Sequence, residues 1–425
     1  MTVIPNPAHV QFSHQDPKGK LGGYLWVIVI AIVPIHRLIA STFGNNFEIL
    51  VLAALVICVA LGRVGRPAAA PIWIICAILI PLASLFSGAS SDTTRSLAVG
   101  IQLGALVGMM PFVLRYYASR DETFIDRALI GFISIQTISS IVGIAQLSGA
   151  SVFGLEANSG RANGLAAHPN VLGLMASLTI LMCYYYTTKA SGRKRVACVL
   201  IAVINAAALI GSGSLSTMTA LAAGAIVMLV ASRATIKTAI AVFAAVISIV
   251  IGTIALGYEP SDLLNPVESR VNTVLGVTND GVASLSIRQA TYDFALESIR
   301  HDPITGVGMD STNQGTFNGT TVVHNYLLRA WYQGGILLIL AMATITAALC
   351  RLIIISLREG RNALPAAMIA AILIFGMTSA FYNQQQYWVP LLFAVAIYGL
   401  IDTRTRSNRS HTASSESPTV ESRAI

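Results

Sequence analysis

The chain has 425 residues, of which 55% are hydrophobic and 11% are charged, and its mean hydropathy is +0.70. Soluble domains carry about 25% charged residues, so this composition excludes an ordinary soluble protein and predicts an integral membrane protein. The formal net charge of +8 does not indicate a nucleic-acid partner, because the basic residues are scattered through short loops instead of forming one basic domain.

The apolar segments of the chain predict its fold. About twelve of them are near the roughly 20 residues that cross a bilayer as a helix. They cover residues 23–41, 46–62, 70–88, 97–116, 127–147, 169–188, 196–212, 215–232, 236–257, 326–350, 363–382 and 386–402. We therefore expect an all-α, polytopic membrane domain over residues 23–402, with a cytoplasmic tail at 1–22 and a disordered cytoplasmic tail at 403–425.

The distribution of Lys and Arg predicts the orientation. If the N-terminus is cytoplasmic, most of the 27 basic residues fall in the inner loops, as the positive-inside rule requires. An even number of spans then places both termini on the inner side. The expected location is the inner (cytoplasmic) membrane of a cell, with several passes.

One predicted outer loop, residues 258–323, is far longer than a connection needs to be. Loops beyond about 15 residues are usually functional or disordered, and this loop contains aromatic and aliphatic residues that argue against disorder. Its segment 284–300, SLSIRQATYDFALESIR, has the rhythm of an amphipathic helix, which Pro303 then ends. The sequence predicts a helical extracytoplasmic cap over the membrane domain.

A group of polar residues begins the segment that follows this loop. His324 at the water-facing end of a helix can titrate near neutral pH, so it is a candidate general base for a hydroxyl group, although an interfacial histidine would look the same. Asn325 offers an amide to a sugar or a phosphate. Arg329 lies one helical turn further in, where an unpaired charge would be costly in lipid. Tyr332 could pack on a sugar ring or belong to an interfacial aromatic belt.

Arg288 in the predicted cap is a second candidate, because its planar guanidinium suits a phosphate group. The alternative is a salt bridge with Asp293 or Glu297, or simple solvation.

The stretch 159–173, SGRANGLAAHPNVLG, is a third candidate. It contains Arg161 and leads through His168 and Asn170 into an apolar span. Such a loop-to-helix junction has exposed N–H groups that suit an anion, and a plain loop with a helix cap is the alternative.

Three stretches then occur in a characteristic order: GRANGLAAHPNVLG, IRQATYDFALESIRHDPITGVGM and HNYLLRAWYQGGILLIL. In this order and spacing the chain resembles the O-antigen ligase and O-antigen polymerase superfamily of bacterial membrane glycosyltransferases. The resemblance implies metal-independent transfer of a glycan from a polyprenyl pyrophosphate carrier in the outer leaflet, with no cofactor. His324 would be the base, Arg288 would clamp the pyrophosphate, and Arg161 would also contact phosphate.

The implied partners are a polyprenyl-pyrophosphate-linked glycan donor, a glycan or glycolipid acceptor, membrane lipids and other polysaccharide export proteins. Ligase and polymerase remain open, because both need the same base and the same clamp.

The chain departs from the family at one point. Family members often carry a basic residue at the outer end of a middle span, whereas the comparable stretch here, residues 211–224 (GSGSLSTMTALAAG), has none. Arg161 or Arg270 replaces that cation, or the donor head group is held differently.

Two other classes of protein stay possible at this point. A transporter or flippase of a lipid-linked glycan would also have about twelve spans, but we find no convincing internal repeat. A metal-dependent enzyme that uses a polyprenyl monophosphate sugar would need acidic residues in an early outer loop, where the chain offers only Glu48.

Overall fold

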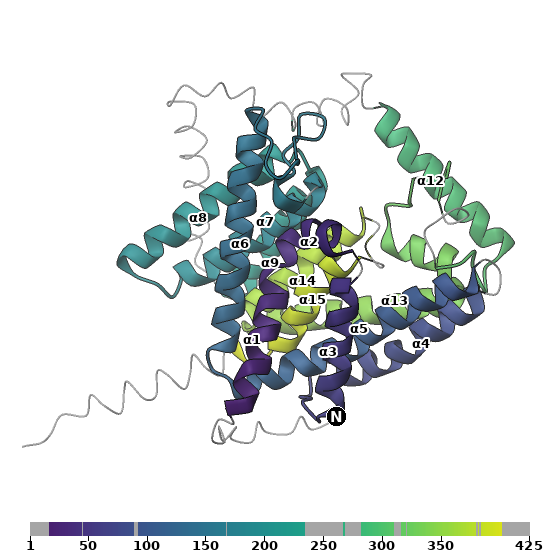
Figure 1. The fold of residues 1–425 in the computed structure, drawn as a ribbon, viewed down its shortest axis with the longest axis horizontal. Helices are drawn as coiled ribbons and strands as arrows, with labels where there is room; N and C mark the ends of the chain where they lie inside the picture. The colour runs from purple at the N-terminus through teal and green to yellow at the C-terminus, as the bar shows by residue number, and fades with distance from the viewer. Residues whose placement is uncertain are drawn as a thin grey trace, which may run out of the picture.

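The computed structural model of the protein describes residues 17–44, 46–88, 92–166, 168–233, 267, 282–309, 316–319, 321–379, 381 and 384–401. Within these residues the chain is a bundle of helices (Figure 1), and its β-structure is limited to three isolated bridges in loops. The expected span 236–257 lies outside the described residues, as do residues 1–16 and 402–425.

The helices follow the predicted segments closely. In the first part of the chain they are α1 (Pro17–Ala31), η1 (Val33–Ile35), α2 (His36–Phe43), α3 (Asn46–Ala60), α4 (Ala70–Gly88), α5 (Thr93–Arg120) and α6 (Phe124–Leu147). The following ones are η2 (Gly164–Ala166), α7 (Pro169–Thr187), α8 (Gly192–Gly211), α9 (Leu215–Ala231), α12 (Val282–His301), α13 (Tyr326–Glu359), α14 (Ala363–Gly376) and α15 (Gln385–Ile397).

Among the described helices, α4, α5, α6, α7, α8 and α13 are long and apolar enough to cross a membrane. The bent pair of α1 and α2 makes a seventh candidate if the two are one span. Helices α3, α9, α14 and α15 are shorter and apolar. The all-α, polytopic membrane fold is thereby confirmed, and the total of twelve spans stays a prediction.

Close helix contacts hold this bundle together through small residues. Gly100, Gly104 and Gly108 recur every fourth residue on the face of α5 that meets α4. A Cβ at Gly104 would lie 2.7 Å from Pro81 Cγ, and one at Gly108 would lie 2.3 Å from Ala77 Cβ. Glycine therefore lets the two helices approach closely, as is common where spans pack in lipid.

The first predicted span, 23–41, is not one straight helix. The chain leaves α1 after Ala31, makes the short η1 turn and continues as α2, with a bend of 48° between the two arms. Pro34 explains the break, because proline has no N–H to donate to the preceding turn and its ring clashes with the carbonyl there. Val33 and Pro34 are buried, and η1 contacts α6, α7, α15 and η2. The break is thus fixed inside the protein.

The predicted span 326–350 is also interrupted. Gly335 inside α13 has φ 62° and ψ −159°, a conformation that is essentially restricted to glycine. The segment 303–308 after α12 fills this break with its backbone. The hydrogen bonds are Ile336 N to Ile304 O (3.0 Å), Val307 N to Tyr332 O (2.8 Å) and Gly308 N to Gln333 O (2.9 Å). The Pro-x-x-Gly-x-Gly and His-Asn motifs, which are separate in sequence, therefore form one unit.

The predicted cap helix is present as α12, and it packs on the short first arm of α13. Ala295, Ile299, Val323 and Tyr332 form a small buried cluster between them, apart from the main core. The position of α12 outside the cell membrane remains a prediction.

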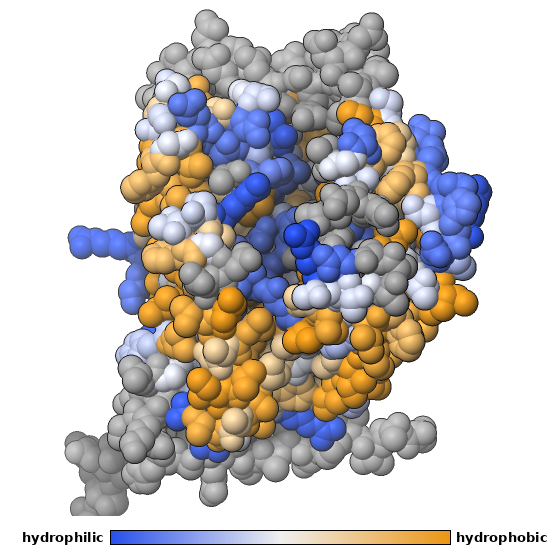
Figure 2. Space-filling view, turned by 45° about the vertical axis from the view of Figure 1, so that its right-hand side comes forward, coloured by the Kyte–Doolittle hydropathy of each residue, from blue (hydrophilic) through white to orange (hydrophobic). Residues whose placement is uncertain are grey.

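The surface has two distinct zones. Figure 2 shows a broad hydrophobic area in the lower half of one face and, above it, a hollow with hydrophilic residues at its bottom.

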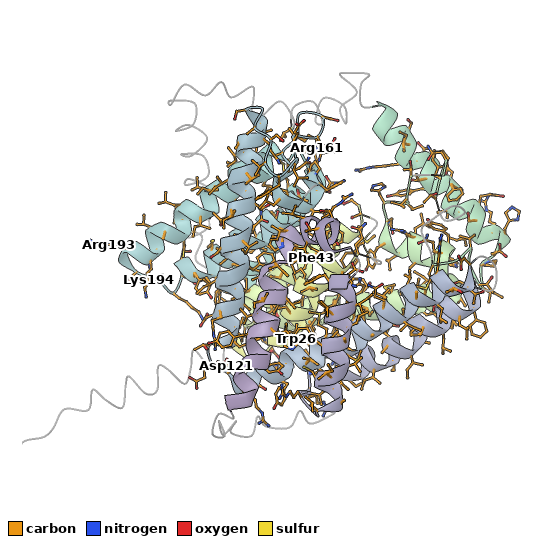
Figure 3. All side chains as sticks on the ribbon, in the orientation of Figure 1. Trp26, Phe43, Asp121, Arg161, Arg193 and Lys194 are labelled. Carbon is orange, nitrogen blue, oxygen red and sulfur yellow. The ribbon has the colours of Figure 1, made fainter. Side chains whose placement is uncertain are left out.

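Asp121 precedes α6 and Arg161 follows it, and the two lie at opposite ends of the molecule (Figure 3). We call these the Asp121 end and the Arg161 end.

Candidate active site

Six side chains that are distant in sequence gather near the Arg161 end. His168 lies within electrostatic range of Arg37, Arg161 and His324. His324 in turn lies within range of Arg288 and Arg329. We call these six residues the basic cluster. They come from α2, the loop before α7, α12, the residues before α13 and α13 itself. Arg270, the remaining predicted candidate, lies outside the described residues.

His168 is the N-cap of α7, and Pro169 occupies the first helical position, where its missing N–H costs nothing. The Nδ1 atom of His168 accepts a hydrogen bond from Asn170 N (3.2 Å). Val171 N and Leu172 N both donate to His168 O at 3.1 Å. The exposed N–H groups that the sequence led us to expect at this junction are therefore already used, and an anion here must be bound by side chains.

The cap also defines the state of the His168 ring. Because Nδ1 accepts a hydrogen bond, the proton of the neutral ring belongs on Nε2. The pKa of His168 is lowered to about 4, chiefly by burial and in addition by the positive charges of Arg37 and Arg161 and by nearby His324. His168 is thus neutral near pH 7 and presents an Nε2–H donor.

Arg161 is held firmly by the protein. Its Nε donates to Ser212 O (2.7 Å), and its Nη2 donates to Asn170 Oδ1 (2.9 Å). Ser212 is the C-cap of α8 and lies in the stretch where the sequence lacks the family's basic residue. The structure therefore brings the Arg161 guanidinium to that turn, where it meets the negative end of the α8 dipole.

Asn325 also has a structural task. It is the N-cap of α13, and its Oδ1 accepts hydrogen bonds from Leu327 N (3.1 Å) and Leu328 N (3.0 Å). The cap occupies the amide oxygen, and the role of the Asn325 amide in binding a sugar or a phosphate stays a prediction. Asn325 fixes the start of α13 directly after His324.

The ring of His324 lies half-buried in front of this cap. Burial lowers its pKa, the charge of Arg288 adds to this, the backbone of Val322 acts in the opposite direction, and Arg329 lowers the pKa again. The Nδ1 atom is buried without a hydrogen-bond partner among the described residues. A neutral imidazole is the form that can accept a proton, so the surroundings suit a general base.

Arg329 and Tyr332 prove to be interior residues. Arg329 is 1% exposed and donates from Nε to Gln333 Oε1 (2.9 Å). Tyr332 is 0% exposed, and its ring packs edge-on against Phe294 at 5.9 Å. The stacking of Tyr332 on a sugar stays a prediction, and in this structure residues of the cap cover its ring. Arg329 contributes charge from within the wall of the site.

Arg288 and Arg37 differ from the other arginines of the cluster. Among the described residues, Arg288 forms no salt bridge with Asp293 or Glu297, and Glu297 pairs instead with Arg300 (3.1 Å) and with His301 (3.2 Å). The guanidinium groups of Arg288 and Arg37 make no hydrogen bond or ion pair with any described residue. Sequence reasoning missed Arg37, although an arginine inside a predicted apolar span is a signal that could have found it.

A cavity on another face of α12 is separate from this cluster. It is open, measures about 660 Å³ and is lined by Asp293, Phe294, Arg300 and Phe317 among others. None of the six cluster residues lines it. In the described part of the chain, no group of three or more His, Cys, Asp or Glu side chains is arranged to hold a metal ion.

Comparison with known families supports the resemblance. The model of a family described as O-antigen ligase matches residues 199–343. The predicted resemblance to the O-antigen ligase and polymerase superfamily is confirmed. A search of the curated proteins finds no match. The O-antigen ligase match includes Arg288, His324 and Arg329 and the break in α13, whereas Arg37, Arg161 and His168 precede it.

This relationship carries a coarse functional conclusion. The match to the O-antigen ligase family in a polytopic membrane protein supports a glycosyltransferase-like role in surface polysaccharide biosynthesis. This family implies a lipid-linked glycan and a glycan acceptor as substrates.

Proposed function

We propose that this protein transfers or polymerises a glycan from a polyprenyl pyrophosphate carrier at the outer face of the cytoplasmic membrane, without a metal ion. The observation that carries the proposal is the neighbourhood of His324 and Arg288. The pKa of His324 is lowered chiefly by burial and next by the charge of Arg288, and the Arg288 guanidinium makes no bond with the described residues. A base and an uncommitted cation are the two groups that this transfer requires.

The chemical step follows from these two roles. His324 takes the proton of an acceptor hydroxyl, and the oxygen attacks the anomeric carbon of the donor sugar. The bond from that carbon to the pyrophosphate oxygen breaks, and the polyprenyl pyrophosphate leaves with the electron pair. Arg288 stabilises the negative charge that develops on the leaving group. A single displacement of this kind inverts the anomeric carbon.

The experiment uses the full-length protein in lipid with a glycan attached to polyprenyl pyrophosphate as donor. His324→Ala is expected to reduce the transfer rate by about 100-fold or more, the usual contribution of a general base. Arg288→Ala is expected to reduce it as well. His301→Ala is the matched control, because His301 lies exposed on α12, is paired with Glu297 and does not belong to the basic cluster. Near wild-type transfer by His324→Ala and Arg288→Ala proteins that insert normally would overturn the mechanism.

Three further measurements define the reaction. Transfer that persists in the presence of a chelator separates the proposal from a metal-dependent enzyme. In a deletion strain, accumulated lipid-linked single repeat units indicate a polymerase, and accumulated long lipid-linked chains indicate a ligase. Movement of the donor across a bilayer without transfer would identify a flippase instead.

A further inference from the structure

The break in the first span brings Arg37 to an unusual depth. A Cβ at Gly23 on α1 would lie 4.0 Å from Asp121 Oδ2, so α1 starts at the Asp121 end. The apolar arm Gly22–Ala31 rises only about 15 Å at 1.5 Å per residue, which is half of a hydrocarbon core of roughly 30 Å. Arg37 follows a few residues later. With the Asp121 end on the cytoplasmic side, as the positive-inside rule predicts, Arg37 would stand in the outer half of the membrane's thickness.

The packing of η1 and α2 places Arg37 near the other residues of the basic cluster. α2 packs against η2, the turn between Arg161 and His168, and η1 packs against η2, α7 and α15. The charge of Arg37 acts on His168 and also on Tyr387 at the start of α15. Since η1 is buried among these elements, the direction of α2 is set by the protein core.

The bonding of the arginines shows which of them can take a ligand. Arg161 is used by Ser212 O and Asn170 Oδ1, and Arg329 is buried against Gln333. Arg37 has neither a hydrogen bond nor an ion pair with a described residue, and its side chain is exposed. A cation at membrane depth is costly unless an anion or water accompanies it, and such residues usually mark the path of a substrate.

We propose that Arg37 binds a phosphate of the lipid pyrophosphate donor, together with the Nε2–H group of His168. This inference rests on the proposed function and adds a second phosphate contact on the side of the site opposite α12. Arg37 offers a charged fork to one phosphate, and His168 offers a neutral donor beside it. Arg288 remains the cation on the cap side, so the pyrophosphate lies between the broken first span and α12.

The first test is a kinetic comparison with varied donor concentration. Arg37→Gln is expected to raise the KM for the donor by about 10-fold or more with kcat nearly unchanged, because it removes binding that ground state and transition state share. Arg37→Lys should recover part of this loss, since lysine keeps the charge but loses the fork. Arg95→Gln is the control, because Arg95 is an exposed arginine on α5 that pairs with Asp92. A donor KM that is unchanged in Arg37→Gln would overturn the inference.

His168 is tested by two substitutions, each of which keeps the hydrogen-bonding group of one of the two ring nitrogens. In His168→Asn the amide oxygen can still accept from Asn170 N, so the α7 cap survives while the donor is lost. In His168→Gln the longer amide can reach the position of Nε2–H. We expect the donor KM to rise in His168→Asn, and to rise less in His168→Gln even if that variant melts at a lower temperature. Equal KM values for wild type and His168→Asn would remove His168 from the inference.

The source of the phosphate is distinguished by direct binding to the purified protein in nanodiscs. Polyprenyl pyrophosphate, polyprenyl monophosphate and phosphatidylglycerol are the three probes. The expected result is that Arg37→Gln weakens binding of the pyrophosphate most and that of phosphatidylglycerol least. If phosphatidylglycerol binding falls as much as pyrophosphate binding, Arg37 reads an ordinary lipid head group, and the inference is wrong.

The two levels of proposal fail differently. If the wild type transfers no glycan from a pyrophosphate donor, the proposed function fails, and the binding measurement with polyprenyl pyrophosphate still tests Arg37. If the wild type transfers glycan and Arg37→Gln has normal KM and normal binding, only the Arg37 inference fails. Unfolding temperatures of wild type and Arg37→Gln should agree, because Arg37 makes no bond that stabilises the described fold.

Discussion

The two broken spans bring opposite walls of the basic cluster into place by different means. In the first span the turn closes locally, with Ile35 N donating to Ile32 O (3.0 Å) and His36 N donating to Val33 O. In α13 the break at Gly335 is closed by a remote segment, whose Ile304 O accepts from Ile336 N (3.0 Å). The break near Pro34 is thus a property of its own sequence. The α13 break needs the cap, and this dependence ties Arg288 to His324.

The largest effect should come from a substitution that prevents the segment 303–308 from docking at the break in α13. Gly335→Ala would place a Cβ 1.9 Å from Ile304 O in a backbone conformation that only glycine adopts readily. We expect a loss of about 3 kcal/mol or more in the free energy of unfolding and near-complete loss of transfer. Gly149→Ala is the control, because Gly149 also has positive φ (86°) but nothing lies within 4 Å. It should cost only about 1 kcal/mol. Equal stability of the two variants would show that the α13 break does not depend on the docked segment.

The next effect tests the support of the first span. Arg161→Gln removes the bonds to Ser212 O and Asn170 Oδ1, which hold the loop against which α2 packs. The expected cost is about 1–3 kcal/mol, measured by thermal unfolding in detergent. Arg288→Gln should unfold at the wild-type temperature, because its guanidinium has no bond to lose among the described residues. If the unfolding temperature falls by a similar amount in both variants, Arg161 and Arg288 do not differ in how firmly the protein binds them.

A smaller effect is expected at the start of α13. Asn325→Ala removes the acceptor for Leu327 N and Leu328 N and should cost about 1 kcal/mol of stability. Asn325→Ser keeps a capping oxygen and should recover most of this loss, with transfer close to wild type. If Asn325→Ser is stable but inactive, the amide has a role in substrate binding beyond the cap.

The smallest effect concerns pH. His324 must be neutral to act as a base, so activity should fall as the pH drops through its pKa. Burial is the main cause that lowers this pKa, and Arg288 lowers it in addition. Removing the charge in Arg288→Gln raises the pKa of His324, so the acid limb of kcat/KM should move to higher pH. An acid limb that stays at the wild-type pH would mean that another group titrates in that profile.

The sequence was sufficient to predict those features of the fold and the site that depend on a local property of the chain, such as hydropathy or a motif. Runs of about twenty apolar residues can be satisfied only by helices in lipid, so α4, α5, α6, α7, α8 and α13 lie where the hydropathy places them. Arg288, His324 and Arg161 could be selected because their motifs occur in a family order. The helix of the cap could be predicted from its periodicity, and it is α12.

Other features depend on contacts between distant segments, and hydropathy does not report those. The burial of Tyr332 against α12 and the use of Asn325 Oδ1 as the helix cap of α13 are two such features, which the sequence analysis did not anticipate. Arg37 was visible in the sequence as an arginine inside a predicted apolar span, but only the packing of η1 and α2 shows that it lies near His168.

The sequence by itself determined that this protein is a helical membrane protein that resembles the O-antigen ligase family, because the lengths of the apolar segments and the order of the motifs can be read along the chain. Only the tertiary structure decided which cations are available to a ligand. A guanidinium is available to a ligand only where other segments do not bring carbonyl or amide oxygens that accept its hydrogen bonds. Those partners, Ser212 for Arg161 and the docked cap for His324 and Arg288, come from parts of the chain that meet only in the fold.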